Sequence, residues 1–176
     1  PETLFITDAA INIFPDLDVK RDIVQNAIDL FTDVGLGTPR VALLSAVETV
    51  TSTITSTIES AALCKMADRG QITGGMLDGP LAFDNAIDPE AAKIKGIKSP
   101  VAGRAQILVV PDLEAGNMLA KNLTFLARAD AAGLVLGARV PIILTSRADS
   151  VRSRMASCAA AVLYADARRR TAALSV

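Results

Sequence analysis

The sequence predicts an α/β fold in which a largely parallel sheet carries helices on both faces. Short apolar runs alternate along the chain with amphipathic stretches, as strands and helices do in such folds. Of the 176 residues, 51% are hydrophobic and only 3% aromatic, which suits β-branched strands buried under Ala- and Leu-rich helices. The length fits one domain or one lobe of a larger enzyme, and the sequence has no internal repeat.

Five short apolar runs have the length and the flanking residues expected of strands. We expect all five to lie in one sheet, and we interpret Asp78-Gly79-Pro80 as a turn after the third run. The five runs are Leu4–Ile6, Arg40–Ser45, Ile72–Leu77, Gln106–Val110 and Pro141–Leu144.

Four amphipathic stretches with apolar side chains at helical spacing predict the main helices. Gly35 follows the first of them, where a glycine commonly ends a helix. The longest irregular region, Asp84–Arg104, contains a short helix at about Pro89–Lys95, and irregular regions of this length are often functional. The four main helices are Asp18–Val34, Thr57–Arg69, Glu114–Arg128 and a last helix that begins near Ser150 and ends in Arg168-Arg169-Arg170.

The composition excludes several classes of function. Basic and acidic residues number 18 and 19, so nothing predicts a nucleic-acid-binding surface, which needs a basic domain. The chain has no His, which excludes Ser-His-Asp catalysis, Cys-His catalysis and His-dependent metal sites within it. Neither GxxxxGK[ST] nor GxGxxG occurs, so neither of the two common phosphate-binding loops is expected.

The most apolar stretch, Leu134–Leu144, is interrupted by Arg139 and Pro141 and is shorter than the roughly 18 residues that a membrane span needs. We therefore expect a soluble protein and attribute its excess apolarity to contacts between subunits or lobes. Cys64 and Cys158 lie in apolar helical patterns without metal or redox spacing, so we expect both in the core. Two unpaired thiols fit a reducing cytoplasm.

Ligands of open parallel sheets bind beyond the carboxyl ends of the strands, so we expect the five strand exits to meet at one cleft edge. The fifth exit carries Ser146 and Arg147 just before a helix. A helix N-terminus attracts phosphate, and a guanidinium can hold phosphate through two hydrogen bonds. The alternative is that Asp149 or Ser150 only caps the helix and that Arg147 forms a surface ion pair.

Other strand exits offer further candidate ligand contacts. Asn117 and Lys121 are i,i+4 neighbours on one helix face, where Lys121 either contacts a second phosphate or is an ordinary solvated lysine. Asp8 and Asn12 follow the first strand, where they either contact a ligand or satisfy the backbone of their own loop. We predict no metal site.

Four segments, in this order, resemble the phosphate acetyl/butyryltransferase family: Gly74–Ala86, Ser99–Ala105, Val110–Asn117 and Leu144–Ser150. The resemblance implies a fold like that of isocitrate and isopropylmalate dehydrogenases, with two lobes and a cleft. It also implies reversible transfer of an acetyl or butyryl group between coenzyme A and inorganic phosphate through a ternary complex, without a metal or a tightly bound cofactor. The last segment resembles the butyryl branch and also fusions of an enoyl-CoA hydratase-like module with a phosphate acyltransferase.

By this resemblance, Ser146 stabilises the developing oxyanion or the thiol, and Arg147 binds phosphate or coenzyme A. The family's acetyl branch has an aspartate base seven residues after that serine, where this sequence has Ser153. Asp149 is the nearest carboxylate that could substitute for it, and it serves equally well as a helix cap.

Members of the family are about twice as long, so the resemblance makes residues 1–176 the carboxy-terminal half of a longer enzyme and predicts a homo-oligomer. Two alternatives remain at this point. One is a dehydrogenase of the same fold that uses NAD and a metal, although the absence of His argues against it. The other is a non-catalytic lobe that binds coenzyme A.

Overall fold

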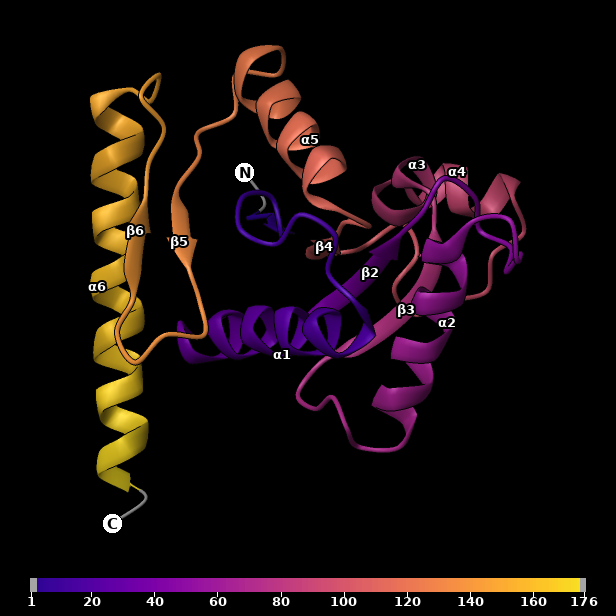
Figure 1. The fold of residues 1–176 in the computed structure, drawn as a ribbon, viewed down its shortest axis with the longest axis horizontal. Helices are drawn as coiled ribbons and strands as arrows, with labels where there is room; N and C mark the ends of the chain where they lie inside the picture. Colours follow the sequence, from indigo (N-terminus) through magenta and orange to yellow (C-terminus); the bar gives the residue numbers. More distant parts are fainter. Residues whose placement is uncertain (1–2, 175–176) are drawn as a thin grey trace.

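The computed structural model of the chain describes residues 3–174. Figure 1 shows the arrangement of its helices and strands. None of the helices in this range is both long and apolar enough to cross a bilayer. The elements follow in the order β1 (Phe5–Thr7), α1 (Leu17–Asp33), β2 (Arg40–Leu44), α2 (Thr55–Asp68), β3 (Met76–Leu81), α3 (Phe83–Ile87), α4 (Pro89–Ile94), β4 (Ile107–Val109), α5 (Leu113–Phe125), β5 (Gly133–Val135), β6 (Ile142–Leu144) and α6 (Val151–Leu174).

Strands β1 to β4 form a parallel sheet in the order β1-β4-β2-β3. Helices α1 and α2 cover one face of this sheet, and α3, α4 and α5 cover the other (Figure 1). The predicted α/β fold with a largely parallel sheet and helices on both faces is therefore confirmed. We call the end of the sheet where β1 to β4 finish its carboxyl edge.

Strand β2 carries the centre of both hydrophobic cores. Val41 and Leu43 point toward α1 and α2, whereas Ala42 and Leu44 point toward α3, α4 and α5, as the two-residue period of a strand requires. All four side chains are buried. On the face that α1 and α2 cover, the ring of Phe31 in α1 packs edge-on against Phe5 of β1, with 5.2 Å between ring centroids.

Residues next to α1 determine where it begins and ends. Both ends lie one residue from those predicted. The Asp16 side chain accepts a hydrogen bond from the Val19 backbone N–H at 2.9 Å, which makes Asp16 the N-cap. The helix ends at Asp33, and Gly35 follows with a φ of +83°, a conformation that glycine adopts without strain. The stop predicted at Gly35 is confirmed.

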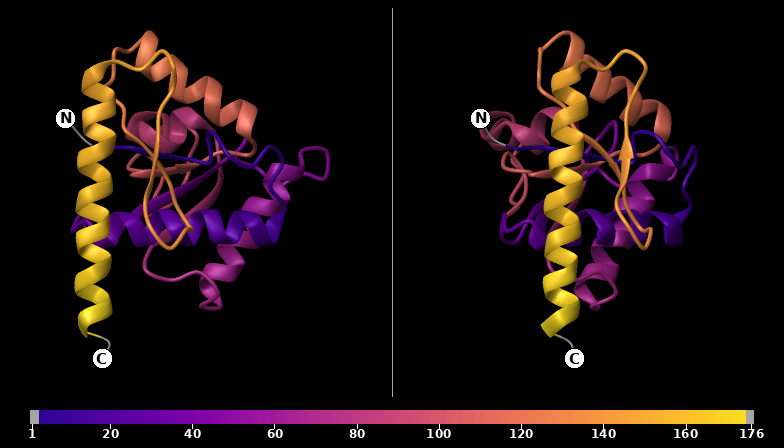
Figure 2. Two further views of the ribbon diagram at one scale, coloured as in Figure 1. Left: turned by 60° about the vertical axis from the view of Figure 1, so that its left-hand side comes forward. Right: turned by 90° about the vertical axis from the view of Figure 1, so that its left-hand side faces the viewer.

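The prediction that Pro141–Leu144 forms a fifth strand of the parallel sheet is wrong. Ile142–Leu144 is β6, which pairs antiparallel with β5 in a separate two-stranded sheet. The connection between them, residues 136–141, is a short loop with Gly137 at a φ of +85°, and so short a link permits only antiparallel pairing. This hairpin packs with α6, and the two stand beside the parallel sheet next to α1 (Figures 1 and 2).

The third strand also differs from the prediction. It runs over Met76–Leu81, so Asp78-Gly79-Pro80 lies within a strand and does not form a turn. A Cβ at Gly79 would come within 2.7 Å of the Leu43 Cβ, so glycine allows β3 to approach β2 here. Proline is tolerated because β3 is an edge strand and its register with β2 shifts at this point.

Candidate functional site

The loop after β1 is organised around the carboxylate of Asp8. Its Oδ1 accepts the backbone N–H groups of Ala10 and Ile11, and its Oδ2 accepts the backbone N–H and side-chain amide of Asn12, all at 2.7–2.9 Å. Partial burial opposes ionisation, but these hydrogen bonds outweigh it and hold the pKa of Asp8 below its ordinary value. Asp8 and Asn12 therefore satisfy their own loop, as one of the two predicted alternatives has it.

The first turns of α5 lie directly against this loop. Asp112 caps the helix by accepting the Ala115 N–H at 2.9 Å. The side-chain amide of Asn117 donates to the Ala9 carbonyl at 3.3 Å. A Cβ at Gly116 would lie 2.8 Å from the Asp8 carbonyl oxygen, so glycine is required for the approach of two backbones.

The structure thus brings three predicted site residues, Asp8, Asn12 and Asn117, together at the carboxyl edge. Lys121 follows one turn after Asn117 on α5 and is exposed. Within residues 3–174 it forms no ion pair with a carboxylate. Its ammonium is therefore available to an anion from outside the described chain.

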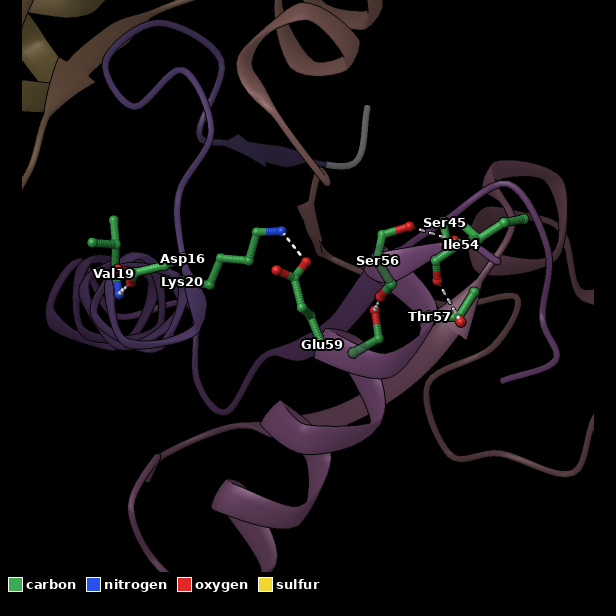
Figure 3. Close-up of polar contacts among 9 residues, drawn as sticks. Asp16, Val19, Lys20, Ser45, Ile54, Ser56, Thr57 and Glu59 are labelled. Carbon is green, nitrogen blue, oxygen red and sulfur yellow. Dashed lines mark hydrogen bonds and ion pairs between the residues drawn. The ribbon is translucent and has the colours of Figure 1, made fainter. Parts of the chain in front are cut away.

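An ion pair that the sequence analysis missed joins α1 to α2 at the same edge (Figure 3). Lys20 Nζ lies 2.5 Å from Glu59 Oε2, and the two side chains are only 7% and 22% exposed. The signal was present, because Lys20 stands four, seven and eleven residues before the buried Val24, Ala27 and Phe31, at core spacing. A basic residue in such a stripe indicates a buried partner.

Hydroxyl groups occupy the exit of β2 (Figure 3). Ser45, the residue after the strand, shares a hydrogen bond of 2.8 Å with the Ser56 hydroxyl on α2. Thr57 accepts the Thr51 N–H at 2.9 Å, and its own hydroxyl lies 2.7 Å from the Ile54 carbonyl oxygen. These bonds hold the β2–α2 loop onto the start of α2.

The exit of β3 carries a third polar cluster. The side-chain amide of the fully buried Asn85 donates to Glu48 Oε2 at 3.3 Å. Lys95 reaches Glu48 at 3.4 Å and Asp84 at 3.1 Å, and its hydrogen bond to Asp84 raises the pKa of Lys95 and lowers that of Asp84. The cluster ties the β2 exit to α3 and to the residue after α4.

Ser146, Arg147 and Asp149 form a tight turn between β6 and α6. The Ser146 N–H donates to Asp149 Oδ2 at 2.6 Å, and the Ala148 N–H donates to Ser146 Oγ at 3.4 Å. Ser150 Oγ accepts the Ser153 N–H at 3.1 Å, so Ser150 caps α6 and Asp149 closes the turn. Ser153 stands in the first turn of α6.

The side chains of Ser146 and Arg147 are exposed. Among residues 3–174 no carboxylate forms an ion pair with Arg147, so the surface ion pair considered above is absent from the described chain. An exposed guanidinium without a carboxylate partner in the described chain, next to a hydroxyl whose own hydrogen can still be donated, is a suitable contact for a phosphate-bearing ligand.

The prediction that all five strand exits share one cleft edge is wrong for this turn. Because β6 belongs to the hairpin, the turn between β6 and α6 lies at the amino-terminal end of α6, on the side of the molecule where α5 ends (Figures 1 and 2). The Asp8 loop meets the opposite end of α5, whose 13 residues extend over about 20 Å. The roles of Ser146, Arg147, Asp149 and Lys121 in catalysis or binding stay predictions.

The two cysteines differ in their surroundings. Cys64 packs beside the core on α2, as expected, and burial raises the pKa of its thiol to about 12. Cys158 is exposed on α6, so its predicted place in the core is wrong. Within the described residues no three His, Cys, Asp or Glu side chains are grouped to hold a metal ion.

A model of the family described as "Phosphate acetyl/butaryl transferase" matches residues 1–162. The chain belongs to this family. It is 83% identical over 171 residues to the phosphate acetyltransferase of Rhizobium meliloti, covering 97% of the chain and 54% of that protein. It is 46% identical over 162 residues to the phosphate butyryltransferase of Clostridium beijerinckii, covering 92% of the chain and 54% of that protein.

A solved structure of the same kind agrees with the fold. The branched-chain phosphotransacylase from Enterococcus faecalis V583 superimposes with a TM-score of 0.83 and 35% sequence identity, over 90% of this chain and 58% of that one. The chain spans about half the length of the phosphate acetyl/butyryltransferases that it matches. These comparisons support the acyltransferase interpretation and not the dehydrogenase.

Proposed function

We propose that the protein transfers an acetyl or butyryl group reversibly between coenzyme A and inorganic phosphate. The observation that carries this proposal is family membership over residues 1–162. The exposed Ser146-Arg147 turn, with no carboxylate paired to the guanidinium within residues 3–174, supports it. The substrates are then acyl-CoA and phosphate in one direction, and acyl phosphate and free coenzyme A in the other.

In this proposal Arg147 binds a phosphate group and Ser146 acts on the reacting carbonyl. A guanidinium can donate two parallel hydrogen bonds to phosphate, which fixes both its position and its orientation. Ser146 Oγ already accepts the Ala148 N–H, so its own hydrogen remains to be donated to the oxyanion or to the thiolate. Lys121, also exposed, offers a second cation for phosphate.

The chemical step begins with loss of the coenzyme A proton, because an ordinary thiol has a pKa of about 8.5 and reacts as the thiolate. The thiolate attacks the carbonyl carbon of the acyl phosphate. The C–S bond forms, the bond from carbon to the phosphate oxygen breaks, and phosphate leaves with the electron pair. Asp149 uses one oxygen to hold the Ser146 N–H and has a second for the thiol proton.

The remaining predicted site residues act by holding the amino-terminal turns of α5. Asp8 and Asn12 stiffen the loop after β1, and Asn117 fastens that loop to α5, from which Lys121 projects. Direct transfer in a ternary complex depends on positioning and not on a covalent nucleophile, so neither cysteine takes part. We propose no metal and no tightly bound cofactor.

We extend the proposal to the whole enzyme, of which residues 1–176 would be the carboxy-terminal half. It would be a cytoplasmic homo-oligomer with two lobes about a cleft, as in isocitrate dehydrogenase. Exposed apolar side chains on the hairpin and α6 support contacts with another subunit or lobe. Among them are Ile142, Met155 and Val162. A fusion to an enoyl-CoA hydratase-like module stays a prediction of the sequence.

The test is to incubate the intact protein with phosphate and either acetyl-CoA or butyryl-CoA, and to follow the release of free thiol. Arg147→Ala should lower kcat/KM by about 30-fold or more, the loss expected when one partner of a charged contact is removed. Ser146→Ala should lower kcat more than it raises KM. The matched control is Arg169→Ala, which removes an exposed arginine near the other end of α6. It should change neither kcat nor KM.

Two results would oppose the proposal. If a folded protein releases no thiol from any acyl-CoA, the non-catalytic coenzyme A-binding lobe is the better account. If Arg147→Ala leaves the kinetic constants unchanged, Arg147 is an ordinary solvated residue. A parallel incubation with NAD and a hydroxy acid should form no NADH. Formation of NADH would favour the alternative function, a dehydrogenase.

A further inference from the structure

The segment between Glu90 and Asp112 is strongly basic. It contains Lys93, Lys95, Lys98 and Arg104 and no acidic residue, in a chain whose net charge is −1. Lys95 is paired with Glu48 and Asp84, as described above. The other three cations surround a single cavity of about 360 Å³, which lies between α4 and the loop that leads into β4.

These three cations have little compensation from carboxylates. Lys98 and Arg104 form no ion pair with any carboxylate of residues 3–174. Lys93 has one partner, Glu90, at 3.6 Å, and both of these side chains are exposed. One carboxylate beside three cations leaves an excess of positive charge around the cavity.

The wall of the cavity is held in place by hydrogen bonds. Ser99 Oγ accepts the backbone N–H groups of Val101 and Ala102 at 3.0 and 3.1 Å, so its own O–H hydrogen remains to be donated. The Gly103 N–H donates to the Asn85 carbonyl at 2.8 Å. A Cβ at Gly103 would lie 2.5 Å from the Pro89 Cα, so the loop is pressed against the first turn of α4. The backbone of this wall is therefore fixed.

Its lining combines a charged rim with an apolar floor. Ala92 and Ala102 are buried and Ile97 is half-buried, and these three supply the apolar part of the lining. A volume of about 360 Å³ falls in the range of small-molecule sites, whereas inorganic phosphate alone would leave most of it unfilled. The cations suit a phosphate group, and the floor suits an organic substituent.

We propose that this cavity is a second ligand site, which binds a small organic phosphate monoester through Lys93, Lys98 and Arg104. It is distinct from the proposed acyl-transfer site. The loop enters β4 at its amino end, whereas Asp8 and Asn117 follow carboxyl ends. Helices α4 and α6 lie at opposite ends of the molecule, which separates the cavity from the Ser146 turn (Figure 1).

The test is a titration of the chain followed by the backbone amide NMR signals of Gly96, Lys98 and Ser99. The probes are phenyl phosphate, inorganic phosphate and phenol at constant ionic strength. Phenyl phosphate should shift these signals saturably, with a midpoint at least about 10-fold below those of the other two probes, since only it uses both rim and floor. Lys98→Ala/Arg104→Ala should raise its midpoint at least about 10-fold.

The matched control is Lys65→Ala/Arg69→Ala, at the end of α2 and just after it, which removes the same charge from an exposed surface elsewhere. An equal loss of binding in both double variants would show a general effect of net charge and overturn the proposal. So would the absence of saturable shifts in the unmodified chain, a result that needs no variant to fold. Signals of Ser146 and Arg147 report the acyl-transfer site separately, so failure of one site is distinguishable from failure of the other.

Discussion

The buried pair of Lys20 and Glu59 allows a quantitative test of how α1 and α2 are joined at the carboxyl edge. Removing one partner of a buried ion pair leaves an unpaired charge and typically costs about 3–5 kcal/mol. The Lys20 side chain is 7% exposed and that of Glu59 is 22% exposed, so an unpaired Glu59 is better hydrated. Glu59→Gln should therefore cost about 3–5 kcal/mol, and Lys20→Met about 1–3 kcal/mol.

The double variant Lys20→Met/Glu59→Gln removes both charges and should cost less than Glu59→Gln alone. Urea denaturation followed by circular dichroism gives each free energy of unfolding. The matched control is the pair of Lys65 and Asp68, which is 2.7 Å long but 65% and 64% exposed. Lys65→Met should leave the denaturation midpoint unchanged. If the two single losses at Lys20 and Glu59 add within about 0.5 kcal/mol, the pair is not coupled and the reasoning is refuted.

Three further predictions concern single residues. Gly116→Ala should lower the free energy of unfolding by about 1–3 kcal/mol in urea denaturation, because the new methyl group meets the Asp8 carbonyl oxygen; a gain in stability would contradict that contact. The lowered pKa of Asp8 means that its hydrogen bonds stabilise the fold above the ordinary value of 3.8 and that this stability is lost as the pH falls below it. Asp8→Asn should reduce this loss of stability at acid pH. If the free energy of unfolding of the variant falls just as steeply, the loss comes from other groups. Near neutral pH, Ellman's reagent should modify Cys158 quickly and Cys64, with its pKa of about 12, only after unfolding; two fast thiols would disprove the burial of Cys64.

Local chemistry explains why most helices and strands were predictable from the sequence. Asp16 and Gly35 lie just outside α1, and the cap and the left-handed glycine depend on neighbouring residues alone. The short apolar run at Arg40–Ser45 predicted a buried strand, and it is continuous because each face of β2 meets a different layer of helices. Sequence patterns formed by residues close together in the chain predict the same helix or strand in any fold that buries the same faces.

Pairing partners, by contrast, depend on geometry that one segment does not contain. The run Pro141–Leu144 has the composition of a strand, but its placement beside β5 follows from the short turn at Gly137. Gly79 and Pro80 have the composition of a turn, yet the missing Cβ and the edge position place them inside β3. In both cases the deciding contact is with another strand.

The candidate site shows the same division. Ser146 and Arg147 were identifiable from their place before a helix, and the structure leaves both exposed. The prediction that they follow a strand of the same sheet as Asp8 and Asn117 is wrong, because β6 pairs with β5 in a separate sheet. Lys20 and Glu59 are 39 positions apart in the chain, so no local motif joins them.

Strand β3, at one edge of the parallel sheet, has a consequence for self-association. An exposed strand edge is a template on which another chain can add a strand of its own. Pro80 offers no N–H for such a bond, and the irregular register around Gly79 breaks the even spacing that an incoming strand would need. The residues that close β3 against Leu43 therefore also protect this side of the protein from edge-to-edge aggregation.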